Sequence, residues 1–240
     1  MTLLLLAGTR EAREIAQRAQ EDGITAVASL AGATREPTPL ALPTRIGGFG
    51  GAPGFQQYVA DHNISAVLDA THPFAHRISE RTARLCAALG LPYCQLLRPP
   101  WPPEPDWLML EREEDLAPHV RAGETVFLAT GRQTLDRFAD LAHARVICRQ
   151  IDPPDAPFPF PNGAYHVARP PFSQADEEAL FTRLGVDWLV AKNAGGPAAR
   201  AKLDAADRLG LRVALLARPP QPPGDKVRDV AEALIWMRAQ

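Results

Sequence analysis

Short apolar runs alternate with longer amphipathic segments along the whole chain. Runs such as 3–7 and 64–68 contain few polar residues, which is typical of parallel strands that are buried on both faces. The segments between the runs repeat apolar residues at helical spacing. This alternation predicts parallel sheets whose strands are joined by right-handed helical crossovers.

The predicted elements fall into two series. In the first series the expected strands are 3–7, 26–30, 45–46, 66–70 and 93–97, and the expected helices are 11–20, 55–62 and 74–89. In the second series the expected strands are 108–110, 125–129, 145–149, 164–168, 188–191 and 212–216. The expected helices of the second series are 113–120, 133–141, 174–184, 198–209 and 226–238.

Proline residues separate these series. The chain has 24 prolines in 240 residues, about 10% where ~5% is usual, and clusters of them act as rigid connectors. The clusters are 99–103, 153–161 and 219–223. We therefore predict an α/β fold of two Rossmann-like parallel-sheet domains, 1–99 and 100–240, with the active site in the crevice between them. The final helix, 225–239, packs either within the second domain or back on the first.

The composition is that of an ordinary globular protein. Hydrophobic residues make up 46%, charged residues 22%, and the formal net charge is −2. Such a small charge gives no general attraction to nucleic acid or to a membrane, so neither is an expected partner. The apolar run 3–6 is far shorter than the roughly 20 residues of a membrane span, and we expect a soluble, cytoplasmic protein. The scattered Cys86, Cys94 and Cys148 predict reduced core residues and no metal site.

The turn after the first strand has the features of an anion site. At 7–12 it reads Ala-Gly-Thr-Arg-Glu-Ala, and it opens a helix. The glycine lets the backbone approach a phosphate, and the free N–H groups of a helix N-terminus favour an anion. The full G-x-G-x-x-G pattern is absent, so a tight turn without a ligand stays open as the alternative.

Two further segments of the first half point to a dinucleotide. The run 47–51 reads Gly-Gly-Phe-Gly-Gly, and we favour a cofactor loop over a flexible surface loop because Phe49 can cover a ring. At the end of the second strand, an acidic residue would select the ribose hydroxyl of NAD, whereas hydroxyls and arginine suit the 2′-phosphate of NADP. Ser29, Thr34 and Arg35 therefore favour NADP, although Glu36 is adjacent.

The segment 69–75 reads Asp-Ala-Thr-His-Pro-Phe-Ala and follows another buried strand. Ligands of open α/β sheets bind at the carboxyl ends of the strands, so we expect Thr71 and His72 to face the crevice. His72 either orients a ligand, or titrates near neutrality, or is a turn histidine bonded to the backbone. The other histidines lack metal or triad spacing and there is no G-x-S-x-G elbow, which disfavours hydrolysis.

Two strand ends in the second half carry basic residues. Arg132 follows the strand 125–129, and Lys192 follows the apolar run 188–191 directly. The ammonium of Lys192 should emerge at the crevice edge, where a cation suits substrate carboxylates or proton donation. A helix cap with an incidental lysine is the alternative.

Together these motifs resemble those of the precorrin-6A reductase family, including its cobalt-precorrin-6A form. The Gly-Gly-Phe-Gly-Gly run followed by Asp-Ala-Thr-His-Pro-Phe-Ala is the most specific part. The matching segments span nearly the whole chain: 8–12, 29–32, 47–51, 69–75, 98–101, 128–132, 192–196, Lys202 and 218–219. The chain departs from the family pattern at Ala33, where arginine is common, and at Ala194, where serine is usual. Arg35 would then serve the 2′-phosphate.

The resemblance implies NADPH-dependent reduction of a double bond in precorrin-6A, a tetrapyrrole, by hydride delivery to a ring carbon, giving precorrin-6B in cobalamin biosynthesis. It implies that 1–99 binds the cofactor and 100–240 the substrate without a metal, and that neighbouring corrin-pathway enzymes are candidate partners. Hydride transfer needs chiefly alignment and exclusion of water, so no side-chain acid need be essential. The candidate cofactor contacts are Gly8, Thr9, Arg10, Glu11, Ser29, Arg35, Gly48, Phe49, Gly50, Gly51, Thr71, His72 and Pro73. The candidate substrate contacts are Arg132, Lys192, Asn193, Gly195, Gly196 and Lys202, and the candidate catalytic residues are His72 and Lys192.

Two other functions stay open at the level of sequence. A noncatalytic module that senses NADP or another nucleotide would keep the glycines of the first half, but it gives no reason for Arg132, Lys192 and Lys202 to converge. A glycosyltransferase-like enzyme also has two α/β halves, but it should bind its nucleotide in the second half.

Overall fold

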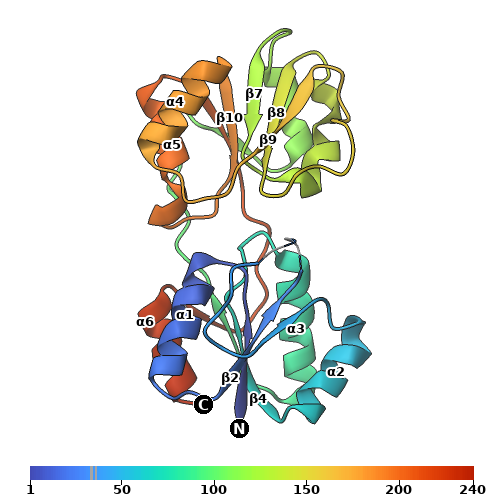
Figure 1. Ribbon diagram of the computed structural model, residues 1–240, viewed down its shortest axis with the longest axis vertical. Helices are drawn as coiled ribbons and strands as arrows, with labels where there is room; N and C mark the ends of the chain where they lie inside the picture. Colours follow the sequence, from blue (N-terminus) through green and yellow to red (C-terminus); the bar gives the residue numbers. More distant parts are fainter. Residues whose placement is uncertain (33–34, 36) are drawn as a thin grey trace. The chain divides into compact units, whose positions relative to one another are not determined.

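The computed structural model describes residues 1–32, 35 and 37–240. The chain forms two compact units, Met1–Pro99 with Pro219–Gln240, and Pro100–Arg218 (Figure 1). Each unit contains one six-stranded parallel sheet flanked by helices, so the expected α/β fold with two Rossmann-like units is confirmed. No helix in these residues is long and apolar enough to cross a membrane.

The first unit has the strand order of dinucleotide-binding domains. Its strands are β1 (Thr2–Leu6), β2 (Ala26–Leu30), β3 (Thr44–Ile46), β4 (Ile64–Asp69), β5 (Tyr93–Leu96) and β12 (Asp225–Val227). Its helices are α1 (Arg10–Glu21), α2 (Gly51–Asp61), α3 (His76–Leu89) and α6 (Val230–Arg238). The sheet order is β12-β5-β4-β1-β2-β3, and it reverses between β1 and β4. The carboxyl ends of those two strands are where such sheets bind ligands.

The end of the chain belongs to the first unit. The segment 219–240 lies with Met1–Pro99, so the second unit is shorter than the expected domain 100–240, and the final helix lies with the first unit, one of its two expected placements. The final helix also begins later than the sequence pattern suggests, because Asp225–Val227 is extended and pairs with β5. A three-residue strand with two charged residues carries no apolar run, and only its partner strand defines it.

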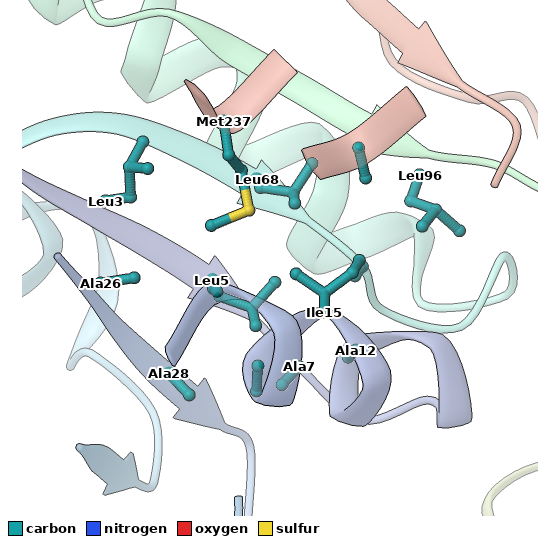
Figure 2. Close-up of a cluster of buried hydrophobic side chains, with 14 of the residues drawn as sticks. Leu3, Leu5, Ala7, Ala12, Ile15, Ala26, Ala28, Leu68, Leu96 and Met237 are labelled. Carbon is teal, nitrogen blue, oxygen red and sulfur yellow. The ribbon is translucent and has the colours of Figure 1, made fainter. Parts of the chain in front are cut away.

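Helix α6 is capped at its start and joined to α1 at its end. Asp229 caps the helix by accepting the backbone N–H of Glu232 at 2.9 Å, and Arg238 forms an ion pair with Asp22 at the end of α1. Figure 2 shows Met237 of α6 in the same buried cluster as Leu5 of β1 and Ile15 of α1. The helix thus supplies part of the core beneath the first sheet.

The second unit repeats this plan. Its strands are β6 (Leu108–Leu110), β7 (Thr125–Leu128), β8 (Arg145–Gln150), β9 (Gly163–Val167), β10 (Trp188–Lys192) and β11 (Arg212–Leu216). Its helices are α4 (Gln174–Leu184), α5 (Ala201–Arg208) and the 3-10 helices η1 (Glu113–His119), η2 (Arg132–Leu141) and η3 (Pro197–Ala199). The sheet order is β6-β11-β10-β7-β8-β9, and it reverses between β7 and β10.

Two helices of the second unit differ in type from the expected α-helices. The segments 113–120 and 133–141 form η1 and η2. Pro118 lies inside η1, where it cannot donate a backbone hydrogen bond, and η2 leaves helical geometry at Thr134 and Phe138. Helical spacing of apolar residues does not distinguish these short 3-10 segments from α-helices.

Candidate functional site

The N-terminus of α1 is tied to the reversal point of the first sheet. Thr9 caps the helix, since its hydroxyl accepts the N–H of Ala12 at 3.1 Å and donates to the carbonyl of Ala70, just after β4, at 2.8 Å. Gly8 is exposed and has a φ of 146°, a value that residues with a side chain avoid. Arg10 is also exposed. The N–H groups of the first turn therefore lie at the carboxyl edge of the sheet, where they can hold an anion.

Glu11 is engaged within the protein. Its carboxylate forms an ion pair with the guanidinium of Arg98, just beyond β5, at 2.6 Å, and the two side chains are only 18% and 11% exposed. The guanidinium compensates a negative charge in the first turn of α1, where a bound phosphate would otherwise be repelled. Glu11, expected as a cofactor contact, therefore has Arg98 as its partner.

Asp69, the last residue of β4, organises the loop that follows. One of its oxygens accepts both the N–H and the hydroxyl of Thr71, at 3.0 and 2.7 Å, and the other accepts the hydroxyl of Tyr93 at 2.9 Å. Asp69 is fully buried, and burial together with this carboxylate raises the pKa of Tyr93. The hydroxyl of Thr71, expected to contact the cofactor, is held in this network.

His72 and Pro73 complete the same loop. The Nδ1 atom of His72 accepts the N–H of Phe74 at 3.3 Å, so a neutral ring carries its proton on Nε2. The carbonyl of Pro73 accepts the side-chain amide of Gln221 at 3.0 Å, and Gln221 in turn accepts the amide N–H of Gln95 at 2.9 Å. The segment that returns from the second unit is thereby fastened to the loop after β4.

Arg45 on β3 joins the end of β2 to the glycine-rich run. One of its terminal nitrogens donates to the hydroxyl of Ser29 at 2.9 Å and to the carbonyl of Gly47 at 2.7 Å. The other donates to the carbonyl of Gly48 at 2.9 Å, and the guanidinium lies over the ring of Phe49, 4.0 Å from its centre. Ser29 is buried beneath this arginine. A cation thus stands where a dinucleotide fold reads the adenosine ribose.

Arg35 is exposed just beyond β2, and Thr34 and Ala33 lie outside the described residues.

Part of the glycine run is explained by its own backbone. Gly50 caps α2 with a φ of 74°, and Gly51 follows with a φ of 89°. Gly54 has no room for a side chain, because a Cβ atom would lie 1.7 Å from the carbonyl oxygen of Phe49. Gly48 has neither constraint, since a Cβ atom there meets nothing within 4 Å. Gly48 is therefore the position at which close approach of a ligand best accounts for the glycine.

Lys192 bridges the two strand ends at the reversal point of the second sheet. Its ammonium, at the end of β10, donates to the carbonyl of Thr130, just beyond β7, at 2.8 Å. Burial lowers the pKa of Lys192, and the carboxylate of Glu113 on η1 opposes that shift. The ammonium of Lys192, expected at the crevice edge, thus lies between the carboxyl ends of β7 and β10.

Asn193 is part of the framework of the second unit. Its side-chain oxygen accepts the N–H of Trp101 at 2.9 Å, and its amide N–H donates to the carbonyl of the same residue at 3.0 Å. The indole of Trp101 donates to the carbonyl of Gly196, and Arg218 donates to the carbonyls of Asn193 and Ala194. These bonds fix the loop after β10, including Gly195, so Asn193 shapes the site rather than presenting its amide to a ligand.

The remaining cations expected to bind substrate lie apart. Lys202 on α5 is partly buried beside the ion pair of Arg149 and Glu177, and desolvation lowers its pKa to about 8. Lys192 instead lies toward η1 and η2, on the other face of the sheet. Arg132 is 47% exposed at the start of η2. The structure therefore does not bring these cations to one point.

The similarity of this chain to known proteins extends over nearly its whole length. The family model described as "Precorrin-6x reductase CbiJ/CobK" matches residues 2–238. The chain is 44% identical to a precorrin-6A reductase of Rhodococcus erythropolis over 98% of this chain and 96% of the relative, and 39% identical to one of Rhodobacter capsulatus over 98% and 95%. The solved structure of "CobK precorrin-6A reductase" superposes with a TM-score of 0.94 at 37% identity, covering 99% of this chain and 96% of that one. The chain belongs to the precorrin-6x reductase family.

The family resemblance drawn from the motifs is thus confirmed. Three residues that organise the first unit were not predicted from the sequence: Arg45, Asp69 and Gln221. The position of Arg45, two residues before the glycine run, was a usable signal. No local pattern indicated Gln221, because its partners Gln95 and Pro73 are distant in the sequence.

Proposed function

We propose that this protein uses NADPH to reduce one double bond of precorrin-6A, giving precorrin-6B. In this proposal the first unit binds the dinucleotide and the second unit binds the tetrapyrrole. Membership of the family and the names of the curated relatives support reduction of a precorrin over a sensing module or a glycosyltransferase.

The observation that carries the choice of NADPH is Arg45 of β3, whose guanidinium lies beside the end of β2. Selection of NADH would place a carboxylate at this position to accept the ribose hydroxyls. Here the hydroxyl of Ser29 is bonded to the guanidinium of Arg45, and Arg35 lies nearby in the sequence. The three hydrogen bonds of Arg45 to described residues use three of its five N–H donors, so two are left for a phosphate.

The residues of the first unit fit the rest of such a cofactor. Gly8 and the N-terminus of α1, capped by Thr9, would hold the diphosphate at the reversal point, and Gly48 would permit close approach of the backbone. His72, held by its own loop, would orient the reacting ring and help to exclude water. When bound, NADPH supplies a hydride for one carbon of the double bond, and the other atom takes a proton.

The residues of the second unit fit a substrate with several carboxylates. Lys192 and Lys202 are largely buried cations, and a buried cation gains most from an anionic partner. We assign Lys192 to carboxylate binding, with the proton taken from solvent, because its ammonium is already oriented by the carbonyl of Thr130.

The test is turnover of precorrin-6A by the purified protein under anaerobic conditions, with NADPH and NADH compared. We expect formation of precorrin-6B with consumption of NADPH and a clear preference for NADPH over NADH. Absence of product with either cofactor would refute the reaction, and an equal or better rate with NADH would refute the cofactor assignment. Cobalt-precorrin-6A in the same assay decides which form of the substrate is used.

A further inference from the structure

Three strands of the second unit end in a row of polar side chains on one face of the sheet. Leu128 of β7 pairs with Val190 of β10 on one side and with Cys148 of β8 on the other. Side chains in a strand alternate between faces, so the residues two positions further along share the face of this row. Those residues are Lys192 and Gln150, which end β10 and β8, and Thr130, two residues beyond β7. Ala129 continues the pairing of β7, since its N–H donates to the carbonyl of Val190 at 2.8 Å.

The packing of the sheet agrees with this alternation. Phe127, Ile147 and Leu189, the neighbours at odd positions, belong to the buried cluster that packs under α4 and α5. The polar row therefore faces the opposite side, where η2 covers β8 and where Glu113 and Arg137 interact with Lys192.

The row contains buried polar atoms that the fold leaves without partners. Within the described residues, the hydroxyl of Thr130 and both polar atoms of the Gln150 amide have no hydrogen-bond partner, and each of these residues is only 6% exposed. The hydroxyl of Thr134 in η2, which covers this face, is in the same state. Buried polar groups are almost always bonded, so several such atoms on one face call for an explanation.

The charges around the row favour an anion. Lys192 and Arg137 contribute two positive charges and Glu113 one negative charge, and Arg137 is paired with Glu113 at 3.3 Å. An ammonium, a hydroxyl and an amide N–H are all donors, which is the set that a carboxylate accepts from.

We propose that Lys192, Thr130 and Gln150 form a subsite for one carboxylate side arm of the tetrapyrrole. The inference rests on the proposed function and extends it to two neutral residues, Thr130 and Gln150, that hold the arm by hydrogen bonds. Because their polar atoms have no contact with solvent, the arm reaches them only when the start of η2, from Gly131 to Thr134, shifts. That segment already leaves helical geometry at Thr134, and Gly131 before it has a φ of 78°.

The test uses apolar replacements of similar size, Gln150→Met and Thr130→Val. Removing an unpartnered buried polar group should leave the melting temperature of the free protein unchanged or raise it. The KM for precorrin-6A should rise roughly 10- to 100-fold in each variant with kcat mostly retained, as for loss of a hydrogen bond to a charged group. Affinity for NADPH should not change.

Thr82→Val is the matched control, because Thr82 on α3 of the first unit also has a buried hydroxyl without a partner. It should raise or preserve the melting temperature and leave the KM unchanged.

A wild-type KM in Gln150→Met and Thr130→Val would overturn the subsite. A lower melting temperature in both variants would also overturn it, because it would show that these groups stabilise the free protein. If either replacement fails to fold, Gln150→Glu gives the second measurement, since an added carboxylate should raise the KM by repulsion and a wild-type KM there also overturns the subsite. If the wild-type protein does not reduce precorrin-6A, the proposed function itself fails, and that result is distinct from a normal KM in the variants.

Discussion

Replacement of Arg45 by methionine tests how the protein distinguishes the two dinucleotides. Methionine keeps an unbranched apolar stem that can still pack on Phe49, but it removes the charge and the donors to Ser29, Gly47 and Gly48. A hydrogen bond to a charged group contributes about 1.5–3 kcal/mol, so losing the contact to a 2′-phosphate should weaken NADPH binding roughly 10- to 100-fold. NADH, which has no phosphate there, should lose only the smaller effect of a less ordered glycine run.

The replacement should also lower stability. The cation over Phe49 lies at a partly exposed site and contributes about 0.5–1 kcal/mol. The two glycine carbonyls can turn to water, but the buried hydroxyl of Ser29 loses its partner, which costs about 1–3 kcal/mol. Titration of both dinucleotides by fluorescence, with thermal melting of the same samples, separates binding from folding. We expect NADPH affinity and the ratio of NADPH to NADH affinity to fall by about the same factor. The melting temperature should be lower than that of the wild type but still show a cooperative transition, because the hydroxyl of Ser29 loses its partner.

Arg35→Ala is the companion variant, because Arg35 is exposed beyond the same strand. A loss of NADPH preference in Arg35→Ala with none in Arg45→Met would place the phosphate contact at Arg35 and refute the argument from β3. An unchanged ratio in both variants would remove the 2′-phosphate from this edge altogether.

Three more outcomes are expected. Lys192→Met should raise the KM for precorrin-6A and leave kcat mostly intact in steady-state assays with saturating NADPH, whereas a fall in kcat of roughly 10²–10⁴-fold would instead make Lys192 a proton donor. Gly48→Val should weaken NADPH binding at least about 10-fold while changing stability by less than about 0.5 kcal/mol, because a Cβ atom there meets nothing within 4 Å; unchanged NADPH affinity would make the run a surface loop. Burial lowers the pKa of Lys202 to about 8, below its ordinary value of 10.5. At pH values between 8 and 10.5, Lys202 is therefore protonated in the unfolded chain and largely deprotonated in the folded protein. Urea unfolding should therefore show a stability gain of up to roughly 3 kcal/mol from pH 8 to pH 10.5 that Lys202→Met lacks, and equal pH slopes would contradict this.

The sequence predicted the sheets well because their strands are buried on both faces. β1, β4, β7 and β10 are short, mostly apolar runs. A strand that is buried on both faces tolerates few polar residues, so its sequence is easily recognised. β12 was missed for the opposite reason. Asp225 and Lys226 are exposed, and what makes them a strand is the pairing with β5.

The sequence located the loops of the candidate site better than the partners of each side chain. Glycines, prolines and caps are local signals, so the turns after β1, β4 and β10 could be found from composition alone. The partners are distant. Asn193 bonds to Trp101, 92 residues away, and Lys192 to Thr130, 62 residues away. Which amide is free to meet a ligand therefore depends on tertiary contacts that no local pattern contains.

The two sheets reverse their strand order in the same way, but different groups supply the positive charge at the two reversal points. In the first sheet, α1 starts directly beyond β1 as an α-helix capped by Thr9, so its aligned N–H groups provide the positive end of a helix dipole. In the second sheet, β7 leads through Gly131 into η2, a 3-10 helix whose geometry breaks at Thr134 and aligns fewer N–H groups. There the positive charge comes from the side chain of Lys192. A helix N-terminus suits a diphosphate that spreads its charge along the backbone, whereas a single ammonium suits a single carboxylate, and this difference supports a dinucleotide in the first unit and a polycarboxylate in the second.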